Sequence, residues 1–509
     1  MSILFSILRQ SLRRMHQTAV IDDQREYTYG QLIGGAMFVA DQIDATTDRK
    51  HIGILLPTSG AFPIALLGAW LARRVVVPLN YMLKPDELGY VIADSDIDTI
   101  ITVGPMLDYM GQQWETAGSG GQDPIPDDIH RIFLDQIDVT GIPPLRWPPI
   151  YSDDDLAVIL YTSGTSARPK GVMLSHKNFE ANVDAAIEHA QLTQADIFLG
   201  VLPQFHSFGL TGLTLLPLRV GSCVVYTARF VPKQIVRLIK RYQPDVFMAI
   251  PSMFSALLSV KDIELGDFVS IRLAISGGEP LPNATFEALL DQYGLRVYEG
   301  YGLTETAPIT NWCTPAHNRI NSVGPALPGV DIRIVDDHDK LLDANQDGEI
   351  LIAGKNVMVG YYHLPRQTAQ VFVDLRSNNR NGENLAPRYF RSGDIGHVDD
   401  DGYLYITGRK KEMLIIGGEN VFPREIEEVL NKHELVKDSA IIGKPDPIRG
   451  EVPLAYVEVK EGSHVDDTQL RAWCRQQLAG YKVPREIRHI DQLPRNSTGK
   501  ILRRKLQAD

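Results

Sequence analysis

Cysteine is scarce in this chain of 509 residues: the three present, Cys223, Cys313 and Cys474, lie far apart. They form no CxxC pair and no Cys/His cluster, so the sequence predicts neither a structural zinc site nor a disulfide framework. The thirteen histidines contain no HExxH pattern, which excludes that metalloprotease motif. A chain without disulfides suits a reducing compartment, and we expect it to be cytoplasmic.

Positive charge is in deficit, because 51 lysines and arginines face 63 aspartates and glutamates, for a net charge of −12. Such a chain offers a nucleic acid no general electrostatic attraction, and no nucleic-acid partner is expected. An anionic ligand must therefore be bound by a few local cations.

Long apolar runs are missing as well. No stretch reaches the roughly 18 apolar residues of a membrane span, so we expect no transmembrane segment. The first sixteen residues, MSILFSILRQSLRRMH, place apolar side chains at helical spacing and arginines behind them. A signal peptide has the opposite order, with charge before the apolar run. Two alternatives remain: a first helix docked on the core, which the pattern favours, or a helix resting on a membrane surface, and thus at most peripheral membrane contact.

Short apolar segments alternate with helical patterns over the first 300 residues, which indicates an α/β fold with a mostly parallel sheet. Strands are predicted at 19–21, 27–29, 51–56, 75–79, 97–103, 156–161, 198–203, 223–226 and 246–250, with helices at 61–72 and 177–192. Residues 108–128 lack periodicity and are predicted to be a surface excursion. A β-rich stretch covers 331–354, and small α and β elements alternate from about residue 409. The length itself favours two or more domains.

The stretch YTSGTSARPKGVMLSH, residues 161–176, follows a predicted buried strand and has the make-up of a polyphosphate cradle. Its hydroxyls come from Tyr161, Thr162, Ser163, Thr165 and Ser166, its flexible positions are Gly164 and Gly171, and its cations are Arg168 and Lys170. A Walker A loop is excluded, because Pro169 precedes Lys170 and Gly171 follows it. An ordinary polar loop remains the alternative from these residues alone.

Three more segments have polar or glycine-rich turns directly after a predicted strand. They are QFHSFGLTG (204–212), RLAISGGEPLP (272–282) and RVYEGYGLTETAP (296–308). Loops after neighbouring parallel strands gather at one edge of a sheet, so these segments and 161–176 can converge on one nucleotide. His206, in the first of them, is either a structural histidine or a ligand contact, and its position leaves both open.

Five segments in order resemble the adenylate-forming superfamily of acyl- and aryl-CoA synthetases, luciferase and adenylation domains. They are YTSGTSARPKGVMLSH, YEGYGLTETAP, YFRSGDIG, GRKKEMLIIGGENVFPREIEEVL and PRNSTGKILRRKL, and they span residues 161–505. The resemblance implies a large N-terminal domain (1–409) of mostly parallel sheets and helices with a β-rich subdomain. It also implies a small mobile α+β C-terminal domain (410–509), with a hinge near Lys411.

The resemblance further implies two half-reactions: a carboxylate and ATP, with Mg²⁺, give acyl-AMP and pyrophosphate, and a thiol then displaces AMP. The implied catalytic residues are Lys500, Thr304, Glu305 as the metal ligand, and His206. The implied ATP- and AMP-binding residues are Thr162, Ser163, Gly164, Thr165, Ser166, Lys170, Gly277, Gly278, Glu279, Pro280, Glu299, Gly300, Tyr301, Gly302, Thr304, Asp394 and Arg409. Gly417, Gly418 and Glu419 are implied to line the thiol path, and His206, Phe208, Gly209 and Leu210 the acyl pocket.

The segment GGENVFPREIEE is similar to that of the CoA ligases, so CoA is the expected acyl acceptor, with an acyl carrier protein as the alternative. No basic residue stands out near the expected acyl pocket for a second carboxylate. This favours a monocarboxylic medium- or long-chain fatty acid, with an aromatic acid still open. A non-catalytic acyl-adenylate-binding protein is the remaining alternative, although every expected charged site residue is present.

Overall fold

The computed structural model describes residues 2–116, 125–162, 168–261, 263–375, 388–495 and 499–507. Four residues predicted to bind phosphate, Ser163, Gly164, Thr165 and Ser166, lie outside these ranges. None of the helices in the described ranges combines the length and the apolar character that a bilayer crossing needs.

The strands within the described ranges form four sheets, and the first has the order β14-β13-β12-β11-β9-β10-β1-β2. Its strands are β1 (Thr18–Ile21), β2 (Glu26–Thr28), β9 (Ile197–Gly200), β10 (Cys223–Tyr226), β11 (Val246–Ala249), β12 (Leu273–Ser276), β13 (Val297–Gly302) and β14 (Ile309–Trp312). Neighbours are parallel from β1 to β13, and the two edge strands β2 and β14 are antiparallel to theirs. The carboxyl ends of the parallel strands therefore meet at one edge of the sheet.

The second sheet has the order β17-β8-β7-β4-β3-β5-β6. Its strands are β3 (His51–Ile54), β4 (Val75–Pro78), β5 (Thr99–Thr102), β6 (His130–Phe133), β7 (Leu156–Thr162), β8 (Lys170–Ser175) and β17 (Gly360–Tyr361). The chain leaves β7 and returns antiparallel along β8, so that Thr162 lies opposite Lys170. The stretch predicted as a phosphate loop thus connects two adjacent strands.

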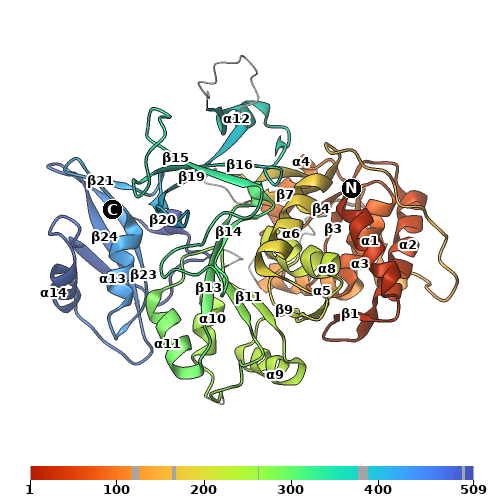
Figure 1. The fold of residues 1–509 in the computed structure, drawn as a ribbon, viewed down its shortest axis with the longest axis horizontal. Coiled ribbons are helices and arrows are strands. Elements are labelled where there is room, and N and C mark those ends of the chain that lie inside the picture. The colour runs from red at the N-terminus through yellow and green to blue at the C-terminus, as the bar shows by residue number, and fades with distance from the viewer. Residues whose placement is uncertain are drawn as a thin grey trace.

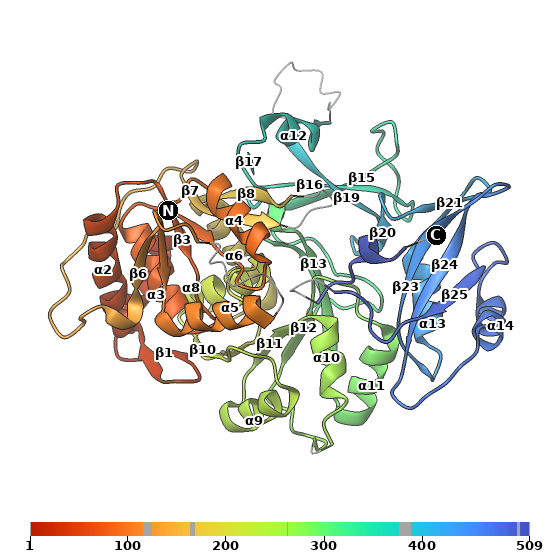
Figure 2. The ribbon, with the colours of Figure 1, turned by 180° about the vertical axis from the view of Figure 1, so that it is seen from behind.

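Two smaller sheets follow along the chain. The third is antiparallel and consists of β15 (Val330–Val335), β16 (Gly348–Gly354), β18 (Phe372–Asp374), β19 (Arg388–Val398) and β20 (Leu404–Arg409). The fourth consists of β21 (Leu414–Ile416), β22 (Glu419–Val421), β23 (Val436–Asp446), β24 (Gly450–Val459) and β25 (Glu486–His489). The chain passes from the third sheet to the fourth through residues 410–413. The fourth sheet, with its helices α13 (Pro423–Asn431) and α14 (Asp467–Gln477), lies at the opposite end of the molecule from the N-terminal helices (Figures 1 and 2).

Apolar helices cover the two large sheets. The sequence of α3 (Ala61–Leu71), AFPIALLGAWL, is apolar on every side, as expected of a helix buried between layers. It packs on α2 (Tyr29–Thr46) at Gly68, where an added Cβ would lie 2.7 Å from Val39 Cβ. Further helices in the described ranges are α4 (Pro85–Asp94), α6 (His176–Ala190), α8 (Leu216–Val220), α9 (Pro232–Tyr242), α10 (Pro251–Leu257), α11 (Asn283–Tyr293) and α12 (Pro365–Gln370). The helices predicted at 61–72 and 177–192 are confirmed as α3 and α6.

The first helix, α1 (Ile3–Arg13), is docked on the core, as the favoured alternative predicted. Ser2 caps its first turn by accepting a hydrogen bond from the Phe5 N–H. Ile3, Leu4 and Ile7 are fully buried, which removes most of the apolar face that a membrane surface would need.

The prediction of a surface excursion over residues 108–128 is wrong for the two parts that the structure describes, 108–116 and 125–128. Helix α5 (Gly104–Thr116) occupies its first part, and Met110 of this helix is fully buried. Ile125 is also buried beyond the gap. The glycine and glutamines of this segment conceal the helix because tertiary packing overrides weak local propensity.

Candidate active site

A cleft of about 790 Å³ lies where the first three sheets meet the C-terminal part of the chain. Segments after β9, β12 and β13 line it from the first sheet, and the ends of β7 and β8 line it from the second. The predicted site residues among its lining are Thr162, Lys170, His206, Phe208, Gly277, Gly278, Gly300, Tyr301, Gly302, Thr304, Glu305, Arg409, Lys411 and Lys500. Residues from 162 to 500 in the sequence thus share one cavity, as the convergence of strand ends predicted.

Tyr361 joins two of the predicted site residues. The Lys170 Nζ lies 5.0 Å from the centroid of its ring, and its hydroxyl donates to Glu305 Oε1 at 2.9 Å. Tyr361 is buried and lies on β17, the strand beside β8. The sequence reasoning missed this residue, because only the pairing of β17 with β8 brings it to the site.

Thr304 and Glu305 lie on a 3₁₀ turn between β13 and β14 (Thr304–Thr306). The Thr304 hydroxyl shares a hydrogen bond of 3.1 Å with the Ser207 hydroxyl. Glu305 offers a hard carboxylate at the cleft wall, and the described residues hold no cluster of three or more potential metal-binding side chains. This donor set fits Mg²⁺, which usually takes one or two protein carboxylates and fills its other positions with phosphate oxygens and water.

Tyr301, Asp394 and Arg409 form a connected group at the edge of the cleft. The Tyr301 hydroxyl donates to Asp394 Oδ2 at 2.6 Å, and Arg409 Nε lies 2.9 Å from Asp394 Oδ1. Burial raises the pKa of Asp394, whereas Arg409 and the Tyr301 hydroxyl lower it. Each carboxylate oxygen keeps a further lone pair, so the group can still accept hydrogen bonds from a ligand.

The turn after β12 carries four of the predicted nucleotide contacts. Gly278 has a φ of +87°, which a glycine adopts without strain. Glu299, within β13, accepts a hydrogen bond of 3.1 Å from the Leu281 N–H and so holds this turn. Glu279 accepts a hydrogen bond of 3.2 Å from the Ile501 N–H, and Pro280 is exposed. Glu279, Pro280 and Glu299 are not among the residues that line the cleft.

Lys500 lies in the cleft beside charges of both signs. Burial lowers its pKa, as does the nearby Arg409, while Glu279, Asp394 and Glu305 act in the opposite direction. The C-terminal part of the chain is therefore oriented with its predicted catalytic lysine toward the residues predicted to bind ATP.

His206 and Phe208 line the cleft at the start of a helix that the sequence analysis did not predict. The helix runs through α7 (Ser207–Leu210), a π-turn (Thr211–Leu215) and α8, and His206 caps it by accepting the Phe208 N–H at 3.3 Å. Burial, with a smaller effect of Lys500, lowers the pKa of His206 to about 4, so its ring is neutral at pH 7. Leu210 is fully buried in the core, and neither it nor Gly209 is among the cleft-lining residues.

Lys411 lies between the third and fourth sheets, and the residues beside it are paired in different directions. Arg409 pairs with Asp394, and Lys410 pairs with Glu349 at 3.4 Å, both in the third sheet. Glu412 instead pairs with Arg503 at 3.0 Å, on the C-terminal side.

Gly417, Gly418 and Glu419 form the exposed turn between β21 and β22 and stand apart from the cleft. The Gly417 N–H donates to the Arg449 carbonyl at 2.8 Å, which places the turn beside a second cavity, of about 410 Å³. Three cations, Lys444, Arg449 and Arg485, line this cavity together with the carboxylates of Asp446 and Glu486, and Lys444 pairs with Glu486 at 2.6 Å. The sequence reasoning missed them, because they are spread over forty residues of ordinary charged sequence.

Comparison with known proteins gives matches over almost the whole chain. The family model of the AMP-binding enzyme matches residues 7–362, and that of the AMP-binding enzyme C-terminal domain matches residues 425–500. A long-chain-fatty-acid–CoA ligase of Bacillus subtilis (strain 168) is 30% identical over 99% of this chain and 94% of its own. A feruloyl-CoA synthase of Amycolatopsis sp is 32% identical over 97% of this chain and 96% of its own. A solved structure of O-succinylbenzoate coenzyme A synthetase from Bacillus subtilis, in complex with ATP and magnesium ion, has a TM-score of 0.83 and 26% identity, covering 98% of each chain.

Proposed function

The chain belongs to the AMP-binding enzyme family and is an AMP-forming acyl- or aryl-CoA ligase that uses ATP, Mg²⁺ and CoA, and we propose that its acid substrate is a medium- or long-chain fatty acid. Every such ligase must first activate a carboxylate, whose negative charge repels nucleophiles and whose oxide is a poor leaving group. The identity of the acid depends on the part of the cleft that would hold the acyl group.

An apolar wall around three glycines is the observation that carries the proposed substrate. Added Cβ atoms at Gly212 and Gly277 would lie 2.9 Å from Met248 Sδ and 3.1 Å from the Phe208 ring, and one at Gly300 would meet Ile275 and Trp312. The side chains around these glycines, Phe208, Met248, Ile275 and Trp312, are all apolar and line the cleft. Gly277 and Gly300 also line the cleft and add no side chain to it, and an apolar chain gains about 25 cal/mol for each Å² that it buries there.

An aromatic acid is the second candidate, and two of these same side chains favour it. Phe208 and Trp312 are aromatic residues of the cleft wall, and an aromatic pair gains about 0.5–1.5 kcal/mol beyond the area that it buries. The 32% identical relative is called a feruloyl-CoA synthase. The two candidates differ in whether the rate rises with chain length or with aromaticity.

In the first half-reaction a carboxylate oxygen attacks the α-phosphorus of ATP, and the bond from that phosphorus to the bridging oxygen of pyrophosphate breaks. We assign Lys170, Thr162 and the adjacent Ser163, Gly164, Thr165 and Ser166 to the departing β- and γ-phosphates. Thr304 donates to the α-phosphate, and Lys500 bridges that phosphate and the acid as negative charge grows. A Mg²⁺ ion at Glu305, when bound, neutralises phosphate charge.

The nucleoside is assigned to the segments after β12 and along β13, next to the apolar wall. Gly277, Gly278 and Tyr301 flank the adenine. Gly300 and Gly302, on the strand beside it, carry no side chain that would occupy its space. Asp394, oriented by Tyr301 and Arg409, accepts hydrogen bonds from the ribose hydroxyls.

In the second half-reaction the sulfur of CoA attacks the acyl carbon, the bond from that carbon to the AMP oxygen breaks, and the thiol proton leaves. We propose that residues 410–509 act as a mobile domain that turns about Lys411 and brings the 417–419 turn to the acyl group. His206 then lies between the acyl pocket and the thiol path.

The second cavity supports CoA as the thiol carrier. Its cations are Lys444, Arg449 and Arg485, and the Arg449 carbonyl accepts the Gly417 N–H, so the cavity adjoins the 417–419 turn and its cations can meet the phosphates of CoA. An acyl carrier protein has a single phosphodiester on its prosthetic arm and has less use for three cations. Arg449→Ala should therefore raise the KM for CoA about tenfold and leave pyrophosphate release unchanged.

The test is acid-dependent pyrophosphate release over fatty acids of graded length and over aromatic acids, followed by CoA-dependent release of AMP. We expect kcat/KM to rise with chain length through the medium-chain range. A maximum at an aromatic acid would replace the fatty-acid assignment with the second candidate. Thioester formation with a carrier protein but not with CoA would overturn the assignment of the second cavity.

A further inference from the structure

Lys500 lies on a short segment, residues 499–506. Arg495 connects the start of this segment to the rest of the C-terminal part of the chain. Arg495 pairs with Asp438 of β23, and its Nη1 donates to the Gly499 carbonyl at 2.8 Å. The Leu502 N–H donates to the Pro494 carbonyl at 2.7 Å. These contacts shape the segment before it reaches the cleft.

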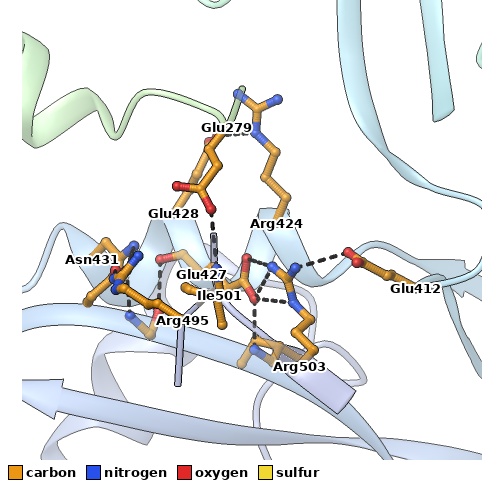
Figure 3. Close-up of polar contacts among 12 residues, drawn as sticks. Glu279, Glu412, Arg424, Glu427, Glu428, Asn431, Arg495, Ile501 and Arg503 are labelled. Carbon is orange, nitrogen blue, oxygen red and sulfur yellow. Dashed lines mark hydrogen bonds and ion pairs between the residues drawn. The ribbon is translucent and has the colours of Figure 1, made fainter. Parts of the chain in front are cut away.

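Arg503 holds the same segment from its other side. Its Nη2 lies 2.8 and 2.9 Å from the two carboxylate oxygens of Glu427 on α13, and its Nη1 lies 3.0 Å from Glu412 (Figure 3). Glu427 is buried, so this pair is strongly directional. The segment is therefore fixed to α13 and β23 and moves with them as one body.

The large N-terminal part of the chain meets this segment at Glu279. The Glu279 carboxylate accepts the N–H of Ile501, the residue after Lys500, at 3.2 Å (Figure 3). Gly499, the residue before Lys500, lies so close to the same part that an added Cβ would be 2.7 Å from Ile250 Cδ1. Both neighbours of Lys500 are thus in contact with loops that follow strands of the first sheet.

We propose that Glu279 is a positioning residue for Lys500, a latch that holds the C-terminal body in the adenylation orientation by accepting the Ile501 N–H. This inference rests on the proposed function, in which Lys500 acts on the α-phosphate. A single hydrogen bond to a carboxylate changes an equilibrium about 10- to 100-fold. A factor of this size favours the adenylation orientation. It is also small enough for the C-terminal body to leave that orientation for the second half-reaction.

The latch makes a different prediction from the assignment of Glu279 as an adenine neighbour. A residue that binds adenine affects ATP and acyl-AMP alike, because both contain the base. A latch affects only the orientation in which Lys500 reaches the phosphate. The two half-reactions, measured separately, therefore distinguish the two roles.

The experiment compares Glu279→Ala and Glu279→Gln in the full-length chain, with ATP, Mg²⁺ and an accepted fatty acid. For Glu279→Ala we expect kcat for adenylation to fall 10- to 100-fold, with the KM for ATP unchanged within twofold. Thioester formation from supplied acyl-AMP and CoA should stay at the wild-type rate or rise. Glu279→Gln keeps an oxygen that accepts the Ile501 N–H, and it should lose less than the alanine variant.

Glu287→Ala is the matched control, since Glu287 is an exposed carboxylate on α11, eight residues along the chain. It should match the wild type in both half-reactions. An equal loss of both half-reactions in Glu279→Ala, a raised KM for ATP, or full adenylation would overturn the latch. Wild-type protein and Lys500→Ala, measured alongside, test the proposed function itself. Absence of pyrophosphate release by the wild type with every acid, or an unchanged rate in Lys500→Ala, would refute that function, whereas the Glu279 variants of an active protein refute or support the latch alone.

Discussion

Two half-buried lysines, Lys170 and Lys500, face the cleft from opposite parts of the chain. Lys170 begins β8 and lies against the Tyr361 ring, whereas Lys500 lies between Arg409 and several carboxylates. We propose different roles for them, Lys170 with the leaving group and Lys500 with the reacting centre.

Lys500→Ala should slow adenylation by a factor on the order of 10²–10³, because it removes a charge that acts mainly in the transition state. Lys170→Ala should also slow adenylation, and far more than it slows thioester formation from supplied acyl-AMP, since no pyrophosphate leaves in that step. Pyrophosphate release and AMP release, assayed separately, check both. Lys177→Ala, which removes only an ion pair with Asp153, is the control. Equal damage to both steps by Lys170→Ala would contradict the assignment of Lys170.

His176 predicts how stability depends on pH. The ring is buried between Trp70 and Tyr151, neither nitrogen has a hydrogen-bond partner among the described residues, and burial lowers its pKa to about 3. A base with a lowered pKa stabilises the fold above its unfolded pKa of about 6.5, and this stability is lost as the pH falls toward 3. Each pH unit below 6.5 removes about 1.4 kcal/mol, so the loss at pH 5 is about 2 kcal/mol.

His176→Phe keeps the ring contacts and cannot be protonated. We expect the variant to lose about 2 kcal/mol less than the wild type between pH 8 and pH 5, measured by urea unfolding. His338→Phe, in the exposed turn after β15, is the control and should follow the wild type. A wild-type pH dependence in His176→Phe would show that other groups cause the acid sensitivity.

At the scale of single elements, the hairpin of β13 and β14 sets the position of Thr304 and Glu305. An added Cβ at Gly302 would lie 1.9 Å from the Pro308 carbonyl oxygen, so Gly302→Ala must push the two strands apart. We expect a loss of about 1–3 kcal/mol in stability and a raised KM for MgATP, measured by thermal unfolding and pyrophosphate release. Gly111→Ala, in α5 with open space at its Cβ, should instead stabilise slightly. A wild-type KM in Gly302→Ala would show that the hairpin does not position Glu305.

The pair of Glu427 and Arg503 anchors the segment of Lys500 to α13. Glu427→Ala should lower the free energy of unfolding of the C-terminal part by about 3 kcal/mol, because it leaves the arginine without its buried partner. It should also slow adenylation by loosening the segment. Glu425→Ala, on the same helix with a more exposed pair to Lys482, should cost less than about 1 kcal/mol.

A double variant separates the two effects at this pair. Glu427→Leu with Arg503→Met should recover most of the stability, since paired apolar side chains often replace a buried ion pair without loss. It should not recover adenylation, because the segment stays unanchored. Full recovery of the rate would mean that the pair serves stability alone.

At the scale of the whole molecule, the proposed hinge at Lys411 lies between residues whose ion pairs belong to the third sheet on one side and to the C-terminal part of the chain on the other. Lys411→Pro restricts φ at this position. We expect adenylation to stay within a fewfold of the wild type, because this orientation already places Lys500 in the cleft. Thioester formation from acyl-AMP and CoA should fall at least about 100-fold, as a blocked conformational step would require. Lys411→Ala should keep both steps, and if Lys411→Pro turns over CoA normally, the hinge lies elsewhere.

The sequence predicted many of the buried strands and the edge of the sheets at which the site residues gather. Apolar runs such as LAVILY and VFMA predicted buried strands because a parallel strand covered on both faces has no polar side. Motif resemblance identified the family, and most of the predicted site residues that the structure describes line the cleft. It did not reveal α5, whose glycine and polar residues hide it, nor the helix after His206, whose π-turn and proline do not follow the ordinary helical pattern.

By itself, the sequence determined the family and so the class of chemistry, because the five motifs that resemble the adenylate-forming superfamily are short segments that can be recognised without the fold. Only the tertiary structure decided which distant groups meet. Tyr361 reaches Lys170 and Glu305 because β17 pairs with β8, and Glu279 meets Ile501 across 222 positions of the chain. Contacts of that kind depend on how sheets and domains pack, and no periodicity in either partner segment records them.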